Sequence, residues 1–167
     1  MEGCGIAIMN VGFPPVINSD SKVLILGSFP SVKSREVGFY YGNPQNRFWR
    51  TLSEWANVPL PGSTEEKKAF ILSHKIALWD VIEKSDIEGS SDGDINDKNS
   101  VPADICSVLS VPKRLKLIIC NGKKAYSVFA NVCKKPPTET ICLSSTSSAN
   151  PRFNKSEWLN ALDYALK

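Results

Sequence analysis

Residues 24–31 read Leu-Ile-Leu-Gly-Ser-Phe-Pro-Ser, and residues 40–49 read Tyr-Tyr-Gly-Asn-Pro-Gln-Asn-Arg-Phe-Trp. The first stretch continues an apolar run that begins at Val23, and such a run is typical of a buried strand. The stretch then ends in a loop of mostly small residues. The second stretch runs from two aromatic residues through a turn to the expected start of a helix near Asn46. Aromatic faces and amides around a strand end can bind a planar heterocycle, such as a nucleobase turned out of a duplex.

Apolar runs and helix signals alternate along the rest of the chain. Strands are predicted at 23–26, 76–82, 115–120 and 138–143, and a surface loop at 84–100. Helices are predicted from Asn46 to about 56, from 63 to 74, from 102 to 109, from 122 to 133 and at the C-terminus. Ser63–Glu66 form a capping box, and Ser156 is expected to cap the last helix, with Leu159, Leu162 and Leu166 facing inward. The alternation predicts an α/β fold with a parallel sheet covered by helices on both faces.

The polar loops of the chain follow the predicted strands. In a parallel α/β sheet the ligand site lies at the carboxyl ends of the strands. We therefore expect one site, built from four loops: Gly27–Ser31, Trp79–Asp80, Asn121–Gly122 and Ser144–Asn150.

The composition indicates one soluble globular domain. The chain has 167 residues, of which 42% are hydrophobic and 22% are charged. We predict a single domain over 1–167, with residues 1–20 as an N-terminal extension. Neither a secretion signal nor a membrane-spanning run is evident, so we expect a cytoplasmic protein and no membrane partner.

The chain has five scattered cysteines, without a Cys-x-x-Cys pair, and a single histidine, His74. This pattern argues against a disulfide framework, a zinc site or an iron–sulfur cluster, and we predict neither a metal nor a cofactor. Residues 1–100 carry 10 basic and 13 acidic side chains, whereas residues 101–167 carry 10 and 4. The basic C-terminal part suits a polyanion partner, although solvated lysines on helix faces explain it equally well.

Several polar and aromatic residues have two interpretations each. Tyr41 and Tyr40 can stack on a base or pack in the core, and packing is favoured for Tyr40. Asn46 can contact a nucleotide or a water, or can cap its helix. Asn121 can be a functional amide of the site or a turn residue. Asp80 can accept a hydrogen bond from a base, or can cap a helix or pair with a lysine. The loop 144–152 can contact phosphates, or can be a flexible connection.

With these residues in view, the chain resembles the uracil-DNA glycosylase superfamily, specifically its hypoxanthine-DNA (deoxyinosine) glycosylase branch. The matching stretches span most of the chain: Leu24–Ser31, Tyr40–Trp49, Ala77–Ile82, Gly89–Asp92, Asn121–Ala125 and Ser145–Asn150. The resemblance implies a three-layer α/β/α sandwich with a central four-stranded parallel sheet. It also implies a monomeric, monofunctional glycosylase that flips a deaminated base out of double-stranded DNA and hydrolyses its N-glycosidic bond.

The resemblance assigns roles to particular residues. It implies that Asn46 and Asn121 are the two essential asparagines. It implies a base pocket made of Gly27, Ser28, Phe29, Pro30, Tyr41 and Asp80, in which Tyr41 stacks on the base and Asp80 reads its edge. It implies DNA contacts from Ser31, Lys123, Ser145, Thr146, Ser147, Asn150 and Arg152.

The chain departs from the uracil enzymes of the superfamily at two places. Phe29 stands where they carry Asp or Asn to activate water, and Leu143-Ser144-Ser145 replaces their His-Pro-Ser. Both changes favour hypoxanthine over uracil. Ser144 and Ser148 stand where prolines are expected in the hypoxanthine branch, which predicts a more flexible loop. A uracil or G/U mismatch enzyme, a non-catalytic binder of nucleotides or damaged DNA, and a structural α/β module remain the alternatives.

Overall fold

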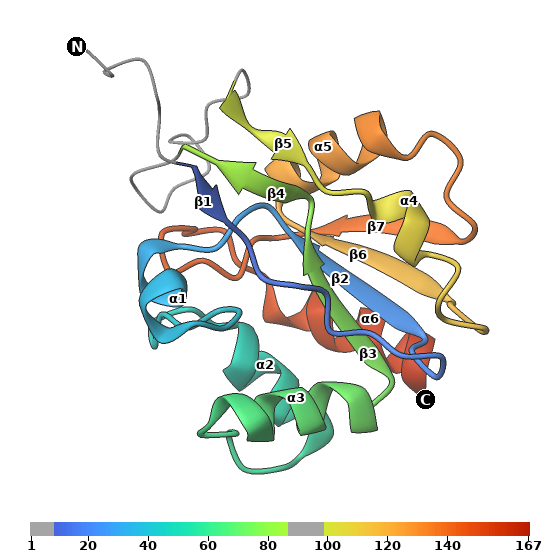
Figure 1. The fold of residues 1–167 in the computed structure, drawn as a ribbon. Coiled ribbons are helices and arrows are strands. Elements are labelled where there is room, and N and C mark those ends of the chain that lie inside the picture. The colour runs from blue at the N-terminus through green and yellow to red at the C-terminus, as the bar shows by residue number, and fades with distance from the viewer. Residues whose placement is uncertain (1–8, 87–98) are drawn as a thin grey trace.

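A computed structural model describes residues 9–86 and 99–167, and its centre is a parallel four-stranded sheet (Figure 1). The strands are β2 (Val23–Gly27), β3 (Ile76–Asp80), β6 (Leu117–Asn121) and β7 (Glu139–Leu143), in the order β3-β2-β6-β7. Each strand overlaps a predicted run, so the parallel sheet is confirmed. The register pairs Gly27 with Asp80 and Asn121 with Leu143, so these four strand ends share one edge.

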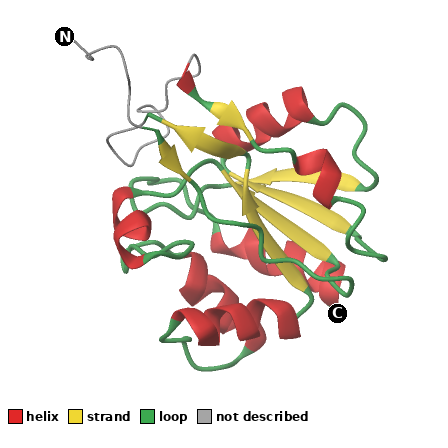
Figure 2. Cartoon of the chain, in the orientation of Figure 1, coloured by secondary structure: helices red, strands yellow, loops and turns green. Residues whose placement is uncertain are grey.

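Helices cover both faces of this sheet (Figures 1 and 2). One face carries α2 (Phe48–Ala56), α3 (Thr64–Ser73) and α6 (Lys155–Leu166). The other face carries α4 (Ile105–Val108) and α5 (Lys123–Val132). The predicted three-layer α/β/α sandwich is therefore confirmed.

Two cores lie between the layers, and the strands contribute to both. Ile25 packs into one core, with Phe48 and Trp158, whereas Leu24 packs into the other, with Phe129. Successive side chains of a strand point to opposite faces, so a continuous apolar run fills both cores. All five residues of β2 are buried, which fixes the strand that carries the first pocket loop.

A second, antiparallel sheet was not predicted. It consists of β1 (Asn10–Val11), β4 (Ile82–Ser85) and β5 (Val101–Pro102), in the order β1-β4-β5. The predicted strand 76–82 ends at Asp80, and the chain then enters β4. Strands of two residues leave no periodicity to detect. Residues 87–98, with the Gly89–Asp92 stretch and most of the predicted loop, lie outside the described residues.

One predicted helix cap is confirmed, and three helix starts differ from prediction. The capping box is confirmed, since Ser63 Oγ accepts a hydrogen bond from the Glu66 N–H at 3.1 Å. The Ser156 cap is wrong: Asn154 occupies the N-cap position of α6, and Ser156 lies in its first turn. Pro102 belongs to β5, so α4 begins later than predicted. A short unpredicted helix, α1 (Val32–Val37), begins after the pocket loop, with Ser31 as its N-cap.

The inward face of α6 is confirmed at two of the three predicted leucines. Leu162 is fully buried, and Leu166 is partly buried and packs against the same core. Leu159 is partly buried outside that core, and Trp158, which was not predicted, is fully buried in it. At the other end of the chain, Val16 exchanges two 2.9 Å backbone hydrogen bonds with Leu78 of β3. Part of the segment that we expected to be an extension thus lies along the edge of the central sheet.

Candidate active site

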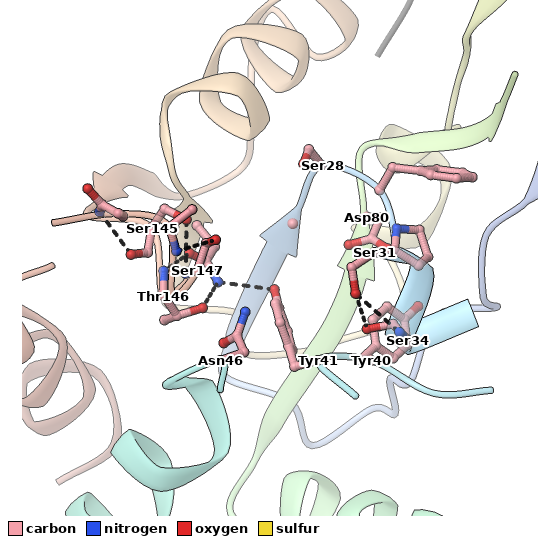
Figure 3. A pocket seen from close by; sticks show the side chains of 16 residues that line it. Ser28, Ser31, Ser34, Tyr40, Tyr41, Asn46, Asp80, Ser145, Thr146 and Ser147 are labelled. Carbon is pink, nitrogen blue, oxygen red and sulfur yellow. Dashed lines mark hydrogen bonds between the residues drawn. The ribbon is translucent and has the colours of Figure 1, made fainter. Parts of the chain in front are cut away.

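A cavity of about 320 Å³ lies at the carboxyl edge of the central sheet (Figure 3). Figure 3 shows Ser145–Ser147 on one side, Asp80 and Ser31 on the other, and Asn46 and Tyr41 between them. All the predicted site residues line it except Lys123 and Arg152. Three further lining residues, Ser34, Tyr40 and Ala149, were not assigned to the site by name, although Ala149 belongs to the predicted loop 144–150.

Gly27 ends β2, and its missing side chain lets two polar groups approach the backbone. A Cβ atom at this position would lie 2.5 Å from Asp80 Oδ1 and 2.9 Å from the Tyr41 hydroxyl oxygen. Asp80 is 5% exposed and pairs in register with Gly27. The absence of a side chain at Gly27 therefore brings a carboxylate and a phenol hydroxyl to the same point of the pocket floor.

Tyr41 is held in an unusual backbone conformation. Its φ of 53° lies in the left-handed region, which non-glycine residues adopt at a cost and which is common at functional sites. One face of its ring stacks on Phe48, with centroids 4.0 Å apart and planes 22° apart. Its hydroxyl accepts a 3.2 Å hydrogen bond from Asn121 Nδ2. Tyr41 is thus fixed by its backbone, by one ring face and by its hydroxyl group.

Asn121 ends β6 and joins the sheet to the loop that follows β7. It is 8% exposed. Its Nδ2 donates to Thr146 Oγ1 at 3.0 Å and its Oδ1 accepts from the Thr146 N–H at 3.0 Å. With the bond to Tyr41, both ends of the amide are engaged within the protein, so in this structure Asn121 holds the pocket walls together.

Asn46 is arranged differently, just before α2. Its Oδ1 accepts a 2.9 Å hydrogen bond from the Phe48 N–H, two residues further on, and so closes a turn just ahead of the helix. The N-cap interpretation is wrong, because Arg47 occupies the N-cap position of α2. Its Nδ2 lines the cavity and has no hydrogen-bond partner in residues 9–86 and 99–167. One side chain therefore stabilises the helix start and presents a free donor to a ligand.

Phe29 forms an apolar part of the wall. It is 9% exposed, packs into the core on the α4–α5 face, and has the Arg35 guanidinium 5.8 Å from its ring centroid. A phenyl ring cannot activate water. Among the described residues, the carboxyl group that lines the pocket is that of Asp80, from the neighbouring strand.

Tyr40 is the largest lining residue that the sequence did not assign to the pocket. Its hydroxyl donates to the Pro14 carbonyl at 2.8 Å, and the side chain is 2% exposed. Burial is the main cause that raises the pKa of Tyr40, and the nearby Asp80 carboxylate and Tyr41 phenol group raise it further. The hydroxyl therefore stays protonated and serves as a fixed donor, which agrees with the packing interpretation of Tyr40.

The loop after β7 is held by hydrogen bonds within the loop and by hydrogen bonds to α6 and its N-cap residue. Ser144 Oγ accepts from the Asn154 N–H at 2.9 Å, and the Ser144 carbonyl accepts from Trp158 Nε1 at 2.8 Å. Ser145 Oγ accepts from the Ser147 N–H at 3.2 Å, and Asn150 Nδ2 donates to the Ser145 carbonyl at 3.0 Å. Ser144, one of the two serines found in place of an expected proline, thus fixes the loop through hydrogen bonds.

The predicted DNA-contacting residues separate into three groups. Thr146 lines the cavity, but it is 1% exposed and its polar groups bond to Asn121. The DNA contact of Thr146 therefore stays a prediction. Lys123 and Arg152 are exposed outside the cavity, whereas Ser31, Ser145, Ser147 and Asn150 line it.

The described residues hold no group of three or more His, Cys, Asp or Glu side chains that could bind a metal ion. In the same part of the chain, every helix is too short or too polar to cross a bilayer.

Comparisons with known proteins agree with this architecture. Residues 14–165 match the family profile of the uracil DNA glycosylase superfamily. A protein of Methanosarcina acetivorans named hypoxanthine DNA glycosylase is 39% identical over 151 residues, which cover 88% of this chain and 94% of the relative. Its namesake from Methanosarcina barkeri is 36% identical over 154 residues, which cover 90% and 96%.

A solved structure agrees as well. The solution NMR structure of a candidate uracil DNA glycosylase from Methanosarcina acetivorans superposes with a TM-score of 0.81 at 33% identity, covering 95% of this chain and 99% of the other. The fold, the pocket at its carboxyl edge and these matches lead to one conclusion: the chain belongs to the uracil DNA glycosylase superfamily.

Proposed function

We propose that this protein is a monofunctional DNA glycosylase that flips deaminated bases, chiefly hypoxanthine, out of double-stranded DNA and hydrolyses the N-glycosidic bond. The observation that carries the proposal is the pairing of Asn46 and Asn121 in one cavity whose wall has Phe29 in place of a water-activating acid. The names of the two Methanosarcina relatives support the choice of hypoxanthine.

The pocket chemistry suits a purine that carries an N1–H group. Asp80 is an acceptor for N1–H, which hypoxanthine has and adenine lacks. Asn46 Nδ2 is a donor for a base oxygen or for the attacking water. Tyr41, backed by Phe48, offers a ring face for stacking, an interaction worth roughly 1–3 kcal/mol per base.

Bond cleavage leaves positive charge on the sugar and negative charge on the departing base. Fixed dipoles aimed at these charges supply the largest share of such catalysis. In this proposal Asn46 stabilises the base or orients the water, and Asn121 acts by fixing Tyr41 and the loop at Thr146. A mispaired base costs less to flip than a paired one, which adds selectivity.

The exposed cations next to the cavity are proposed to hold the duplex. Lys123 begins α5 and Arg152 follows the loop after β7, and both are exposed. We propose that they contact phosphates, and that Ser31, Ser145, Ser147 and Asn150 contact the flipped nucleotide and its neighbours. We expect a monomer in the cytoplasm, and light scattering of the free protein tests the monomer.

Base release from a labelled duplex tests the function. The protein is incubated with duplexes that contain inosine, uracil or only normal bases, and abasic sites are then cleaved with alkali. We expect a strand product from the inosine duplex, and none without alkali, because no lysine of the described residues lines the cavity. Product from uracil but not from inosine would contradict the hypoxanthine assignment and select a uracil or G/U mismatch enzyme.

Phe29 also favours a second candidate, a binder without catalytic activity. A pocket without a water-activating acid at this position can hold a flipped base and leave its bond intact. Tight binding of the inosine duplex with no base release over prolonged incubation would select this candidate.

A further inference from the structure

Arg47, which follows Asn46, lies under the loop of residues 145–150. Its Nη1 donates two hydrogen bonds, to the Ser147 carbonyl at 3.2 Å and to the Asn150 carbonyl at 3.0 Å. Its backbone N–H donates to the Thr146 carbonyl at 3.0 Å. Three bonds from one residue thus tie the loop to the start of α2.

The guanidinium is also fixed from its other side. Its Cζ lies 5.0 Å from the ring centroid of Phe153, a distance typical of a cation–π contact. A planar group that stacks on a ring while donating to two carbonyls is a geometry that lysine does not reproduce. The charge of Arg47 is therefore turned toward the protein, whereas Arg152, at the end of the same loop, is exposed.

The consequence is a link between the two proposed essential asparagines. Arg47 is adjacent to Asn46 in the chain, and its N–H holds Thr146, whose own N–H and hydroxyl bond to Asn121. The geometry points to Arg47 as a positioning residue that holds the 145–150 loop in the shape that closes the pocket. The kinetic part of this inference rests on the proposed function, and the structural part does not.

Two substitutions separate positioning from phosphate binding: one at Arg47, which contacts the loop, and one at Arg152, just beyond its end. Arg47→Met removes the side-chain donors but keeps the backbone N–H and an unbranched stem, and Arg152→Met removes an exposed cation. Hydrogen exchange of the backbone amides of residues 145–150 reports loop order in the free protein. The slope of log affinity against log salt concentration, measured with an inosine duplex, reports phosphate contacts.

We expect Arg47→Met to speed exchange in residues 145–150 about tenfold or more, since several loop bonds depend on it. Its salt slope stays at the wild-type value, and base release at saturating protein falls about tenfold. Arg152→Met lowers the slope by about one and leaves loop exchange unchanged. Arg114→Met, an exposed cation before β6 at the far end of the sheet, changes none of these quantities.

The inference is overturned if Arg47→Met leaves loop exchange at the wild-type rate, or if its salt slope falls as in Arg152→Met. Exchange in β2 and β6 shows whether the variant is folded. If protection is lost there as well, Arg47→Lys replaces it, with the same expected direction in the loop. A wild-type protein that releases no base contradicts the proposed function alone, because loop exchange still decides the role of Arg47.

Discussion

The start of α2 and the end of β6 each place an asparagine at the pocket, but the two differ in burial and in hydrogen bonding. Asn121, at the end of β6, is 8% exposed and makes three hydrogen bonds to Tyr41 and Thr146. Asn46, before α2, is partly exposed and uses only its oxygen, for the Phe48 N–H. Burial with full bonding makes an amide part of the framework, whereas partial bonding leaves a donor for the ligand.

Asn46→Ala is expected to have the largest effect on base release. It removes the cavity-facing donor, and loss of one such donor costs about 10²–10³ in rate in other enzymes. The loss of the acceptor for the Phe48 N–H lowers the free energy of unfolding by only about 1 kcal/mol. Single-turnover base release and urea unfolding measure the two quantities.

Asn43→Ala is the matched control for this prediction. Asn43 Oδ1 accepts from the Gln45 N–H at 2.9 Å, the same turn bond as at Asn46, but Asn43 does not line the cavity. The two roles of Asn46 would not be separable if Asn43→Ala lost as much activity as Asn46→Ala.

Asn121→Ala is expected to lower both activity and stability. It leaves the buried N–H of Thr146 without its acceptor and releases the Tyr41 hydroxyl, which together cost roughly 2–3 kcal/mol of unfolding free energy. Base release falls about a hundredfold because the pocket walls separate. An unfolding free energy equal to that of Asn46→Ala would contradict the framework role.

Gly27→Ala tests the pocket floor between the two asparagines. The new Cβ would displace Asp80 Oδ1 and the Tyr41 hydroxyl, and displacements of about 1 Å can cost about a hundredfold in rate. Gly62→Ala is the control, since a Cβ at Gly62 meets nothing within 4 Å. Full activity in Gly27→Ala would show that the close approach of these groups is not needed.

Tyr41→Phe is expected to have the smallest effect. It keeps the ring that stacks on Phe48 and removes the acceptor for Asn121 Nδ2, which still bonds to Thr146. We expect a loss of about 1 kcal/mol in unfolding free energy and a several-fold loss in rate. Tyr126→Phe, on the exposed side of α5, should match the wild type. A loss of unfolding free energy as large as that of Asn121→Ala would show that the bond between Asn121 and Tyr41 accounts for most of the framework role of Asn121.

The sequence predicted which loops meet, because the carboxyl ends of parallel strands share one edge. It did not predict what each side chain does there. The partners of Arg47 lie 100 and 103 residues further along the chain, and no local pattern reports such a contact. For Thr146 the resemblance implied a DNA contact, and the polar loop gave no sign that one of its members turns inward to Asn121. The sequence offers one signal for this contact: Asn121 ends β6 and Thr146 follows β7, and β6 and β7 are neighbouring strands.

The most direct test is hydrogen exchange of the two side-chain amides, followed by NMR in the free protein and with hypoxanthine added. We predict slow exchange for the Asn121 NH₂ group, which stays unchanged with hypoxanthine. For Asn46 we predict fast exchange, with a change in chemical shift on binding. Equal protection of the two groups in the free protein, or a shift at Asn121 with none at Asn46, would contradict the account.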